Sequence, residues 1–226
     1  MFKQKKILSL IVARAGSKGL KNKNIKLFRG KPLIQWTMEA AKKSKYIDYN
    51  LISTDSKKII ALSKKMKIES PFKRPRHLSG DNSSMASVIL HTLRWIKKNK
   101  KEKFDFLLLL QATSPLRTNL HIDSAIKYYF TKSKNYGETL VSVNKMPLKI
   151  GWLMKMKGPF VKFIFQNIGK GETIRRQNLQ KYFLPNGAIF FSKIKGFRGN
   201  FYKQKTLHFE MNTNVSIDID HKQDIK

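Results

Sequence analysis

The stretch IVARAGSKGLKNKN, residues Ile11 to Asn24, begins in an apolar run and ends in a loop rich in glycine and lysine. The apolar part, Ile7 to Ala13, predicts a buried parallel strand, because short continuous runs of Ile, Leu and Val bounded by chain breakers are typical of strands covered on both faces. A secretory signal is a second interpretation, but the run is short for one and further cations follow it. We therefore expect a strand that opens into a functional loop.

Apolar runs and helical patterns alternate along the chain beyond this strand. They predict strands at Tyr49 to Thr54, Phe106 to Leu110 and Thr139 to Val143, and helices at Leu33 to Lys43, Ser56 to Met66, Ser87 to Lys98 and Asn119 to Phe130. Strands and helices in alternation favour an α/β fold, a mostly parallel sheet with helices on both faces. The Ser56 hydroxyl is a candidate N-cap for the second helix.

The alternation of predicted strands and helices ends after Pro147. The segments GPFVKFIF, NGAIFFS and NVSIDID, which begin at Gly158, Asn186 and Asn214, look like strands with few helices between them. We expect a smaller mixed-β portion here, at roughly residues 145–185, inside a single domain that spans residues 1–226. A length of 226 residues is compatible with one large α/β domain.

The composition is strongly basic. Lysine and arginine total 47 against 14 acidic residues, a formal net charge of +33, so nucleic acid is a possible partner. The lysines are spread along the whole chain, whereas nucleic-acid binders concentrate cations on one element, so we expect no nucleic-acid partner. No apolar run approaches the ~20 residues that cross a bilayer, so we also expect no membrane partner and a cytoplasmic location. Cysteine is absent, which excludes disulfides, thiolate metal sites and a cysteine nucleophile.

Ligands of doubly wound sheets bind beyond the carboxyl ends of the strands. In this sequence that rule brings four loops to one crevice: Arg14 to Lys23, Ser53 to Asp55, Gln111 to Arg117 and Asn144 to Lys149. The first loop has neither the Gly-x-Gly-x-x-Gly fingerprint nor a Walker ending. It does combine backbone donors at residues 15–17 with three cations, Arg14, Lys18 and Lys23, and this combination suits a nucleoside triphosphate.

Four separated motifs, IVARAGSKGLKNKN, LLQATSPLR, LPNGAIFF and SIDID, occur in this order over nearly the whole chain. Together they resemble the acylneuraminate cytidylyltransferases, which activate sialic and related nonulosonic acids by coupling them to CMP. The more distant CMP-Kdo synthetases are similar in the opening strand, but the first two motifs are closer to the sialic acid branch. The resemblance implies a Rossmann-like nucleotidyltransferase fold, CTP and a nine-carbon 2-keto sugar acid as substrates, Mg²⁺ or Mn²⁺ as cofactor, and a homodimer built on the mixed-β portion.

The resemblance also implies roles for individual residues. The residues expected to bind CTP are Arg14, Ala15, Ser17, Lys18, Lys23, Asn24, Arg74 and Ser84. Those expected to bind the sugar are Gln111, Lys149, Arg176 and Phe190. Asp218 and Asp220 are expected to bind the metal, since alternating residues of a strand share one face. Catalysis is expected from Arg14, Lys23 and the two aspartates, and the general base stays open between Asp220 and a water on the metal.

Three positions depart from the family pattern. Leu184 stands where many members have arginine, Phe190 where they have tyrosine and Met146 where they have histidine. A sugar pocket that lacks these polar groups favours a 9-deoxy, diacylamino sugar of the legionaminic or pseudaminic type. A CMP-Kdo synthetase-like enzyme and a catalytically inactive relative with a binding role remain as alternatives.

Overall fold

A computed structural model describes residues 2–17, 19–136, 138–164 and 180–225 of the chain. A six-stranded sheet forms its centre, with the strand order β10-β6-β9-β5-β1-β4. The strands are β1 (Ile7–Val12), β4 (Tyr49–Ser53), β5 (Phe106–Gln111), β6 (Thr139–Lys145), β9 (Phe183–Lys193) and β10 (Thr206–Glu210). Five of them run in one direction and β9 runs against them, which confirms the mostly parallel α/β fold.

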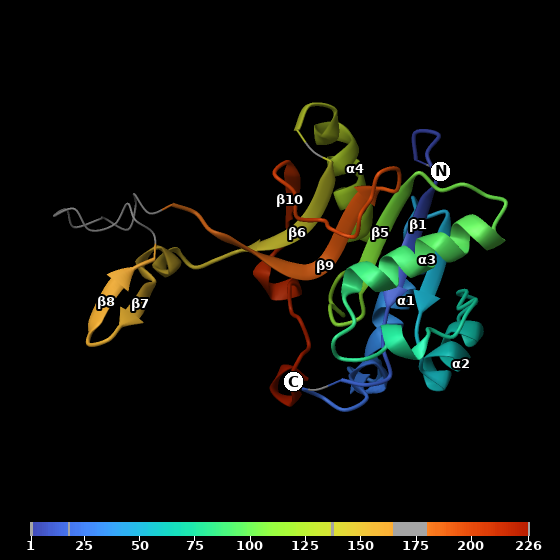
Figure 1. The fold of residues 1–226 in the computed structure, drawn as a ribbon, viewed down its shortest axis with the longest axis horizontal. Helices are drawn as coiled ribbons and strands as arrows, with labels where there is room; N and C mark the ends of the chain where they lie inside the picture. The colour runs from blue at the N-terminus through green and yellow to red at the C-terminus, as the bar shows by residue number, and fades with distance from the viewer. Residues whose placement is uncertain (1, 18, 137, 165–179, 226) are drawn as a thin grey trace.

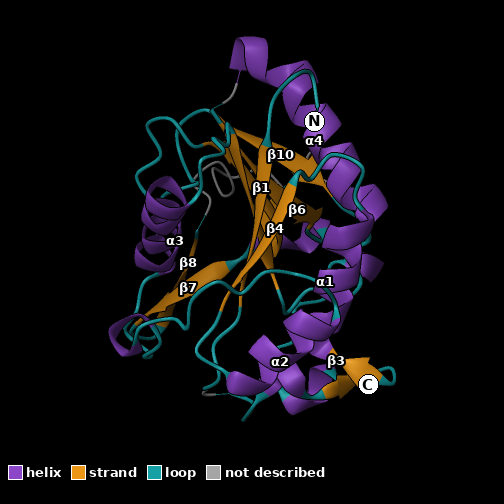
Figure 2. Ribbon diagram, turned by 90° about the vertical axis from the view of Figure 1, so that its right-hand side faces the viewer, coloured by secondary structure: helices purple, strands orange, loops and turns teal. Residues whose placement is uncertain are grey.

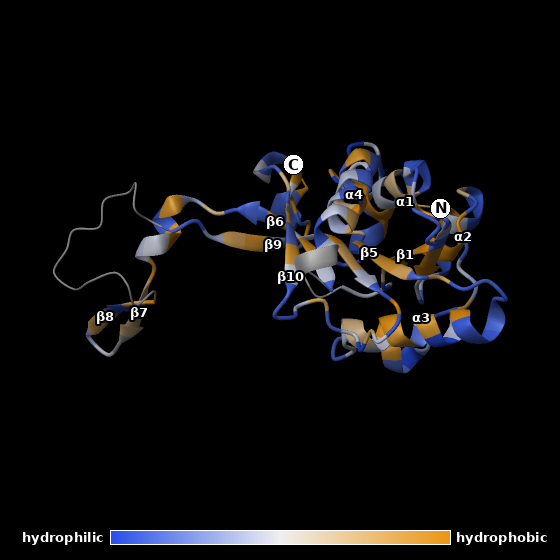
Figure 3. Cartoon of the chain, turned by 90° about the horizontal axis from the view of Figure 1, so that it is seen from above, coloured by the Kyte–Doolittle hydropathy of each residue, from blue (hydrophilic) through white to orange (hydrophobic). Residues whose placement is uncertain are grey.

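Helices cover the two faces of the sheet unequally (Figures 2 and 3). The helices are α1 (Leu33–Lys43), α2 (Lys57–Lys65), α3 (Met85–Asn99) and α4 (Asn119–Tyr136). In both views α3 lies on one side of the sheet, and α1 and α4 lie on the other. The second face is therefore covered by several helices, whereas α3 is the one α-helix packed on the first among the described residues.

Serine side chains that accept hydrogen bonds from backbone amides mark where two of the helices begin. The prediction that Ser56 caps α2 is confirmed, since its hydroxyl accepts a hydrogen bond from the Ile59 amide. Helix α3 begins two residues before the predicted start because Ser84 caps it, accepting from the amide of Ser87. Both caps satisfy amides that have no partner inside the first turn of a helix.

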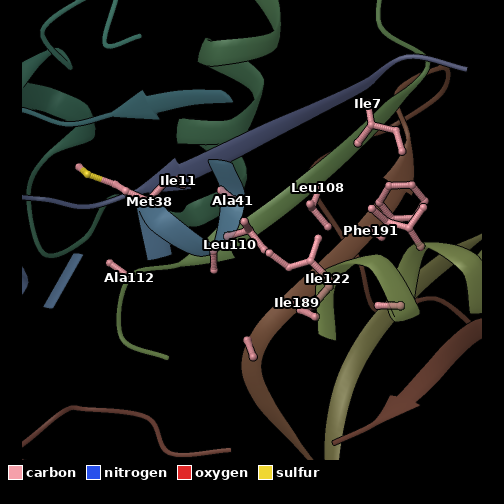
Figure 4. Packing of buried hydrophobic residues seen from close by; sticks show 14 of the residues in the cluster. Ile7, Ile11, Met38, Ala41, Leu108, Leu110, Ala112, Ile122, Ile189 and Phe191 are labelled. Carbon is pink, nitrogen blue, oxygen red and sulfur yellow. The ribbon is translucent and has the colours of Figure 1, made fainter. Parts of the chain in front are cut away.

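Successive side chains of β5 point to opposite faces of the sheet, so this strand packs against the helices on both sides. Phe106, Leu108 and Leu110 belong to the cluster packed on α1 and α4, while Leu107 and Leu109 belong to the cluster under α3. Figure 4 shows the first cluster, in which side chains of Ile7, Leu108 and Phe191 come together from three neighbouring strands. The Phe106 and Phe191 rings stack with centroids 5.2 Å apart. The sheet is thus buried on both faces, as its continuous apolar strands require.

Strand β9 separates the two parallel parts of the sheet. It pairs antiparallel with β5 on one side and with β6 on the other. Residues 144–149, the end of β6 and the segment after it, are therefore a full strand away from the end of β5. This position disagrees with the expectation that Asn144 to Lys149 lines the same crevice as the loop after β5.

A hairpin extends far from the sheet, at the left of Figure 1. It consists of β7 (Met154–Lys157) and β8 (Phe160–Phe163), and a 3₁₀ segment at Leu148–Trp152 leads into it. Its apolar side chains are exposed, with Met156 83%, Phe160 73% and Val161 64% accessible. We call residues 146–164 the arm; it is the described portion of the predicted mixed-β substructure.

The prediction of a strand at SIDID is wrong. Residues 216–220 pair with no strand among the described residues, and the segment is tied to the sheet by a hydrogen bond from the Ile219 amide to the Thr113 carbonyl. Two short strands, β2 (Leu27–Phe28) and β3 (Lys31–Pro32), form a separate hairpin before α1. In the described part of the chain, no helix is both long and apolar enough to cross a membrane.

Candidate active site

A cavity of about 400 Å³ opens where the carboxyl ends of β1 and β5 meet. The loop after β1, the loop after β5, the start of α3 and the SIDID segment form its walls. Three of the 14 acidic residues of the chain line it, Asp81, Asp218 and Asp220, together with the cations Arg14, Lys23 and Arg74. Charges of both signs therefore face one hollow in a protein that is otherwise strongly basic.

The loop after β1 is held by hydrogen bonds at both ends. The amide of Ala15 donates to Asp55 Oδ1 at 2.8 Å, and the side-chain amide of Asn24 donates to the Arg14 carbonyl at 3.0 Å. Gly16 and Ser17 line the cavity, whereas Ala15 does not. The expectation that the Ala15 amide serves the ligand is therefore not supported, because Asp55 uses that donor to shape the loop.

Two cations of this loop point at carboxylates across the cavity. Arg14 Nη1 donates to Asp81 Oδ1 at 2.5 Å, and Lys23 Nζ donates to Asp220 Oδ1 at 2.6 Å. The Lys23 side chain is only 12% exposed while that of Asp220 is 61% exposed, so the ammonium is the better sequestered partner. Lys18, the third predicted cation, lies outside the described residues. The second pair places the Lys23 ammonium next to a carboxylate of the SIDID segment, inside the same cavity.

Gly19 lets the loop approach the SIDID segment closely. A Cβ atom at residue 19 would lie 2.8 Å from the backbone oxygen of Asp220, a distance that real Cβ atoms essentially never show. Residue 19 is therefore glycine because a side chain would collide with the Asp220 backbone, not because of its backbone angles. The same contact forms a side pocket of about 280 Å³ lined by Arg14, Lys23 and His221.

Arg74 lies beneath the cavity and is 4% exposed. Its Nε donates to Ser53 Oγ at 3.1 Å, its Nη2 donates to the Ser53 carbonyl, and its amide donates to the Thr54 carbonyl at 2.8 Å. Burial lowers the pKa of Arg74 to about 10, and the charge of Asp55 opposes that shift. The guanidinium stays charged at neutral pH, so it contributes a fixed positive charge at the end of β4.

One wall of the cavity is acidic: it carries Asp218 and Asp220, which stand on either side of the buried residue Ile219. Ile219 is fully buried, and the two aspartates line the cavity. The expectation that both carboxylates face one space is thus met without a strand. Burial raises the pKa of Asp218, and the negative charge of Asp220 raises it further, while a hydrogen bond with Thr113 and the charge of Lys23 lower it.

This wall fits a divalent cation of the Mg²⁺ type. Mg²⁺ binds through one or two carboxylates plus substrate phosphates and waters, so a cage of three protein ligands is not required. No group of three or more metal-binding side chains occurs in the described part of the chain, which agrees with a site completed by substrate. Burial is the main cause of the raised Asp218 pKa, and a cation between the two aspartates would also relieve the smaller contribution from the charge of Asp220.

Gln111 reaches the cavity beside Pro185 to Gly187, a stretch of β9 where the pairing with β6 is irregular; we call this stretch the turn. Gly187 has φ +71, and a Cβ there would lie 2.9 Å from Gln111 Oε1 and 3.6 Å from Asp218 Oδ2. The neighbouring Asn186 is buried, and its side-chain amide donates to Ser216 Oγ at 2.9 Å. The turn therefore connects Gln111 to the start of the SIDID segment and sets the space between Gln111 and Asp218.

Arg117 joins the strands that carry these residues. Its Nη1 donates to the carbonyls of Gln111 and Ala188, both at 3.1 Å, and the side chain is 1% exposed. Nε and Nη2 have no hydrogen-bond partner among the described residues. Burial lowers the pKa of the guanidinium, with no carboxylate to oppose the shift. Arg117 is thus a structural link beneath the site rather than a group that faces the cavity.

Several predicted site residues lie elsewhere. Phe190 is 7% exposed and packs on Phe201 at 5.3 Å, in the cluster under α3, so its assignment to sugar binding is corrected: the ring is part of the core. Lys149 is exposed at the base of the arm and does not line the cavity. Ser84 borders the site as the cap of α3 but does not line it either. Arg176 lies outside the described residues.

Three residues at the site were not assigned roles from the sequence. Asp55 holds the loop after β1, Asp81 accepts from Arg14, and Thr113 bonds to Asp218. Asp55 and Thr113 directly follow the ends of β4 and β5, and this place in an α/β sheet was the available signal. For Asp81, the only signal in the sequence was its position in a loop of small polar residues.

The chain is similar in sequence to known proteins over most of its length. The family described as "Cytidylyltransferase" matches residues 8–211. The chain is 34% identical to a CMP-N,N'-diacetyllegionaminic acid synthase of Legionella pneumophila, over 95% of this chain and 91% of that protein. It is 31% identical to an N-acylneuraminate cytidylyltransferase of Streptococcus agalactiae over 97% of this chain, and it spans 51% of the length of that relative. A pseudaminic acid cytidylyltransferase of Campylobacter jejuni is 29% identical, with 98% and 94% covered.

A solved structure shares the fold at low sequence identity. CMP:2-keto-3-deoxy-manno-octonic acid synthetase in complex with CTP superposes with a TM-score of 0.68 over 96% of this chain and 94% of that one. The two are 13% identical, so the likeness concerns the fold alone.

Proposed function

Because the chain belongs to the cytidylyltransferase family, we propose that it couples CTP to a nonulosonic acid, giving the CMP-sugar and pyrophosphate. The observation that carries the proposal is the cavity itself, which is lined by two cations of the loop after β1, Arg14 and Lys23, and by the two SIDID carboxylates. Lys23 already bonds to one of these carboxylates, Asp220. The names of the relatives supply the substrate class: sialic, legionaminic and pseudaminic acids. Since the chain spans about half the length of the N-acylneuraminate relatives, the activity is a proposal for this chain.

The reaction is an in-line substitution at the α-phosphorus of CTP. The anomeric hydroxyl oxygen of the sugar acid forms the new bond to phosphorus, the bond to the oxygen bridging to the β-phosphate breaks, and pyrophosphate leaves with that electron pair. The hydroxyl proton passes to a base that the described residues do not identify. Such a reaction depends on positioning and on charge neutralisation more than on covalent catalysis.

The residues of the cavity supply both requirements. Arg14 and Lys23, with the amides of Gly16 and Ser17, would bind the triphosphate, because cations and backbone donors line that wall together. To bind phosphate, Lys23 exchanges its bond with Asp220 for one to the ligand. Gln111, positioned by Gly187 and the Arg117 link, would contact the acceptor sugar on the opposite side.

We propose Mg²⁺ or Mn²⁺ as the cofactor, held by Asp218 and Asp220. When bound, the cation would neutralise charge on the phosphates during the reaction. The Thr113 hydrogen bond orients Asp218 and favours its ionised form. Asp220 would carry the direct contact, since its carboxylate already binds a cation, Lys23, whose Nζ lies 2.6 Å from Asp220 Oδ1.

A homodimer is a further part of the proposal. The arm exposes Met156, Phe160 and Val161 far from the sheet, and large apolar side chains exposed together are typical of surfaces that pack on another chain. A second copy is the partner that the predicted mixed-β portion implies. We also propose a cytoplasmic location, because the substrate would be CTP.

Initial-rate release of pyrophosphate tests the proposed reaction. Folded protein is incubated with CTP, Mg²⁺ and each of four acceptors: N-acetylneuraminic, N,N'-diacetyllegionaminic, pseudaminic and Kdo. We expect turnover with at least one of the three nine-carbon acids, with the legionaminic or pseudaminic type faster than N-acetylneuraminate. A preference for Kdo would reassign the acceptor, and the absence of turnover with all four acceptors would support an inactive relative with a binding role.

A further inference from the structure

A second cavity, of about 900 Å³, lies at the opposite end of α3 from the candidate active site. The active-site cavity contacts Met85 and Val88 at the start of this helix, whereas the second cavity contacts Leu90, Leu93 and Ile96 in its later turns. It also reaches Phe104, just before β5 begins, so it lies at the amino-terminal edge of that strand. We call this second cavity the α3 cleft.

The α3 cleft exists because this face of the sheet is thinly covered. Helix α3 packs here without a second α-helix among the described residues (Figures 2 and 3), and the loop after β9 completes the wall with Ile194, Lys195 and Phe197. The loop is held in place, since the Ile194 amide donates to the Asp105 carbonyl at 2.8 Å and the Phe197 amide donates to the Ile194 carbonyl at 3.1 Å. The cleft is thus formed between a fixed loop and a fixed helix.

Its interior is apolar and its rim is cationic. The apolar lining consists of Leu90, Leu93, Ile96, Phe104, Ile194 and Phe197. The charged rim has six cations, Arg94, Lys97, Lys100, Lys101, Lys103 and Lys195, and one carboxylate, Glu102. Six of thirteen lining residues are therefore cationic, against 47 of 226 in the whole chain, so the rim is richer in cations than the average of this basic protein.

Most of these cations have no acidic partner. Lys100 pairs with Glu69 at 3.0 Å, and Glu102 accepts from Lys6 rather than from the rim. The other five cations of the rim form no ion pair among the described residues. Positive charge that no acidic residue in the described part of the chain neutralises, set around an apolar cavity, is complementary to a molecule with an apolar body and an anionic end.

We propose that the α3 cleft binds an anionic phospholipid at a bilayer surface, with an acyl chain in the apolar interior and the phosphate at the lysine rim. An apolar contact and a polybasic patch are the two signals that together give stable but reversible membrane association. A soluble anion such as phosphate would use the rim alone and leave the apolar lining without a role. The proposal replaces the expectation from the sequence that the protein has no membrane partner, and it is independent of the proposed reaction.

Vesicle sedimentation tests the contribution of the rim. The variant Lys101→Gln/Lys103→Gln removes two unpaired cations of the cleft, and Lys57→Gln/Lys58→Gln removes two exposed cations of α2, which packs on the other side of the sheet. The two variants have the same net charge. With vesicles of phosphatidylcholine containing phosphatidylglycerol, we expect the cleft variant to bind about 25-fold more weakly, about fivefold for each lysine, and the α2 variant to change by less than about twofold.

A fluorescent label tests whether the interior is occupied. The chain has no cysteine, so Leu93→Cys and Lys58→Cys each give a single labelling position, in the cleft and on α2. An environment-sensitive label at residue 93 should shift to shorter wavelength with phosphatidylglycerol vesicles and not with inorganic phosphate. The label at residue 58 should not respond to either.

The outcomes separate the proposal from its alternatives. Equal losses of vesicle binding in the two glutamine variants would show that the total charge of the protein attracts the bilayer, and would overturn the proposal. A response of the residue 93 label to inorganic phosphate would identify the cleft as a site for soluble anions. A change of oligomeric state in Lys101→Gln/Lys103→Gln, measured by light scattering, would assign the cleft to a second copy of the chain. The proposal requires vesicle binding to fall strongly in the cleft variant and to stay within about twofold in the α2 variant.

Discussion

The variant Gly187→Ala tests how the turn between Pro185 and Ala188 serves the site. The added Cβ would lie 2.9 Å from Gln111 Oε1, while ordinary contacts begin at 3.4 Å, so the Gln111 amide must move by about 0.5 Å. The moving atom is the end of a flexible side chain, so the collision itself costs little stability. The backbone cost comes from φ +71, which disfavours alanine by about 1–2 kcal/mol. For a domain of this size, we expect a Tm lower by about 2–8 °C.

Activity should fall by more than this loss of stability explains. A misplacement of about 1 Å in a positioning group can reduce rates about 100-fold, so a shift of about half that size predicts a decrease of about tenfold in kcat/KM for the sugar acid. Gly196→Ala is the matched control, because residue 196 has φ +76 and nothing lies within 4 Å of its added Cβ. It should lose similar stability and keep its activity. The assay is pyrophosphate release at varied acceptor, with thermal unfolding of both variants.

Equal kcat/KM values for Gly187→Ala and Gly196→Ala, measured on folded protein, would refute the reasoning. That result would mean either that Gln111 makes no contact with the acceptor or that the turn does not set its position. A decrease confined to KM for CTP would instead place Gln111 on the nucleotide side of the cavity.

Three further predictions concern the metal wall, the buried arginine and the nucleotide base. Asp220→Asn should reduce kcat by about 100-fold, whereas Asp218→Asn should cost less and be partly rescued by excess Mg²⁺; the reverse order in a Mg²⁺ titration would exchange their roles. Arg117→Ala and Arg117→Met both lose the hydrogen bonds to the Gln111 and Ala188 carbonyls, but only alanine leaves a large cavity, so the Tm of Arg117→Ala should lie below that of Arg117→Met; equal Tm values in thermal unfolding would argue against cavity formation. CTP should be used with kcat/KM at least about 100-fold above that of UTP, and comparable initial rates for the two nucleotides would contradict a base-selective site.

The parallel core of the fold could be predicted from local patterns. Continuous apolar runs such as Phe106 to Leu110 carry enough information to identify buried strands, and the hydroxyl of Ser56 identifies where a helix begins. The place of β9 could not be predicted in this way. Its insertion between β5 and β6 is a long-range pairing, and nothing in its own residues specifies which strands lie beside it.

The errors at the site have the same physical origin. Asp218 and Asp220 were assigned correctly to one cavity, because alternation holds in any extended segment, yet the segment forms no strand. Phe190 was assigned to the sugar because it stands where the resembling family has tyrosine, but β9 directs its ring into the core under α3. The amide of Ala15 was assigned to a ligand because the loop pattern could not show that Asp55 already accepts from it.

Titration of CTP into the protein by calorimetry, with Mg²⁺ present, tests the central claim most directly. The claim is that the cavity at the ends of β1 and β5 binds the triphosphate through Arg14 and Lys23. We expect one CTP per chain, at least tenfold weaker binding for Lys23→Gln, because a charge-assisted contact is lost, and unchanged binding for Lys21→Gln, whose side chain is exposed and does not line the cavity. CTP binding of equal strength in the wild type and in Lys23→Gln would contradict the assignment of this cavity.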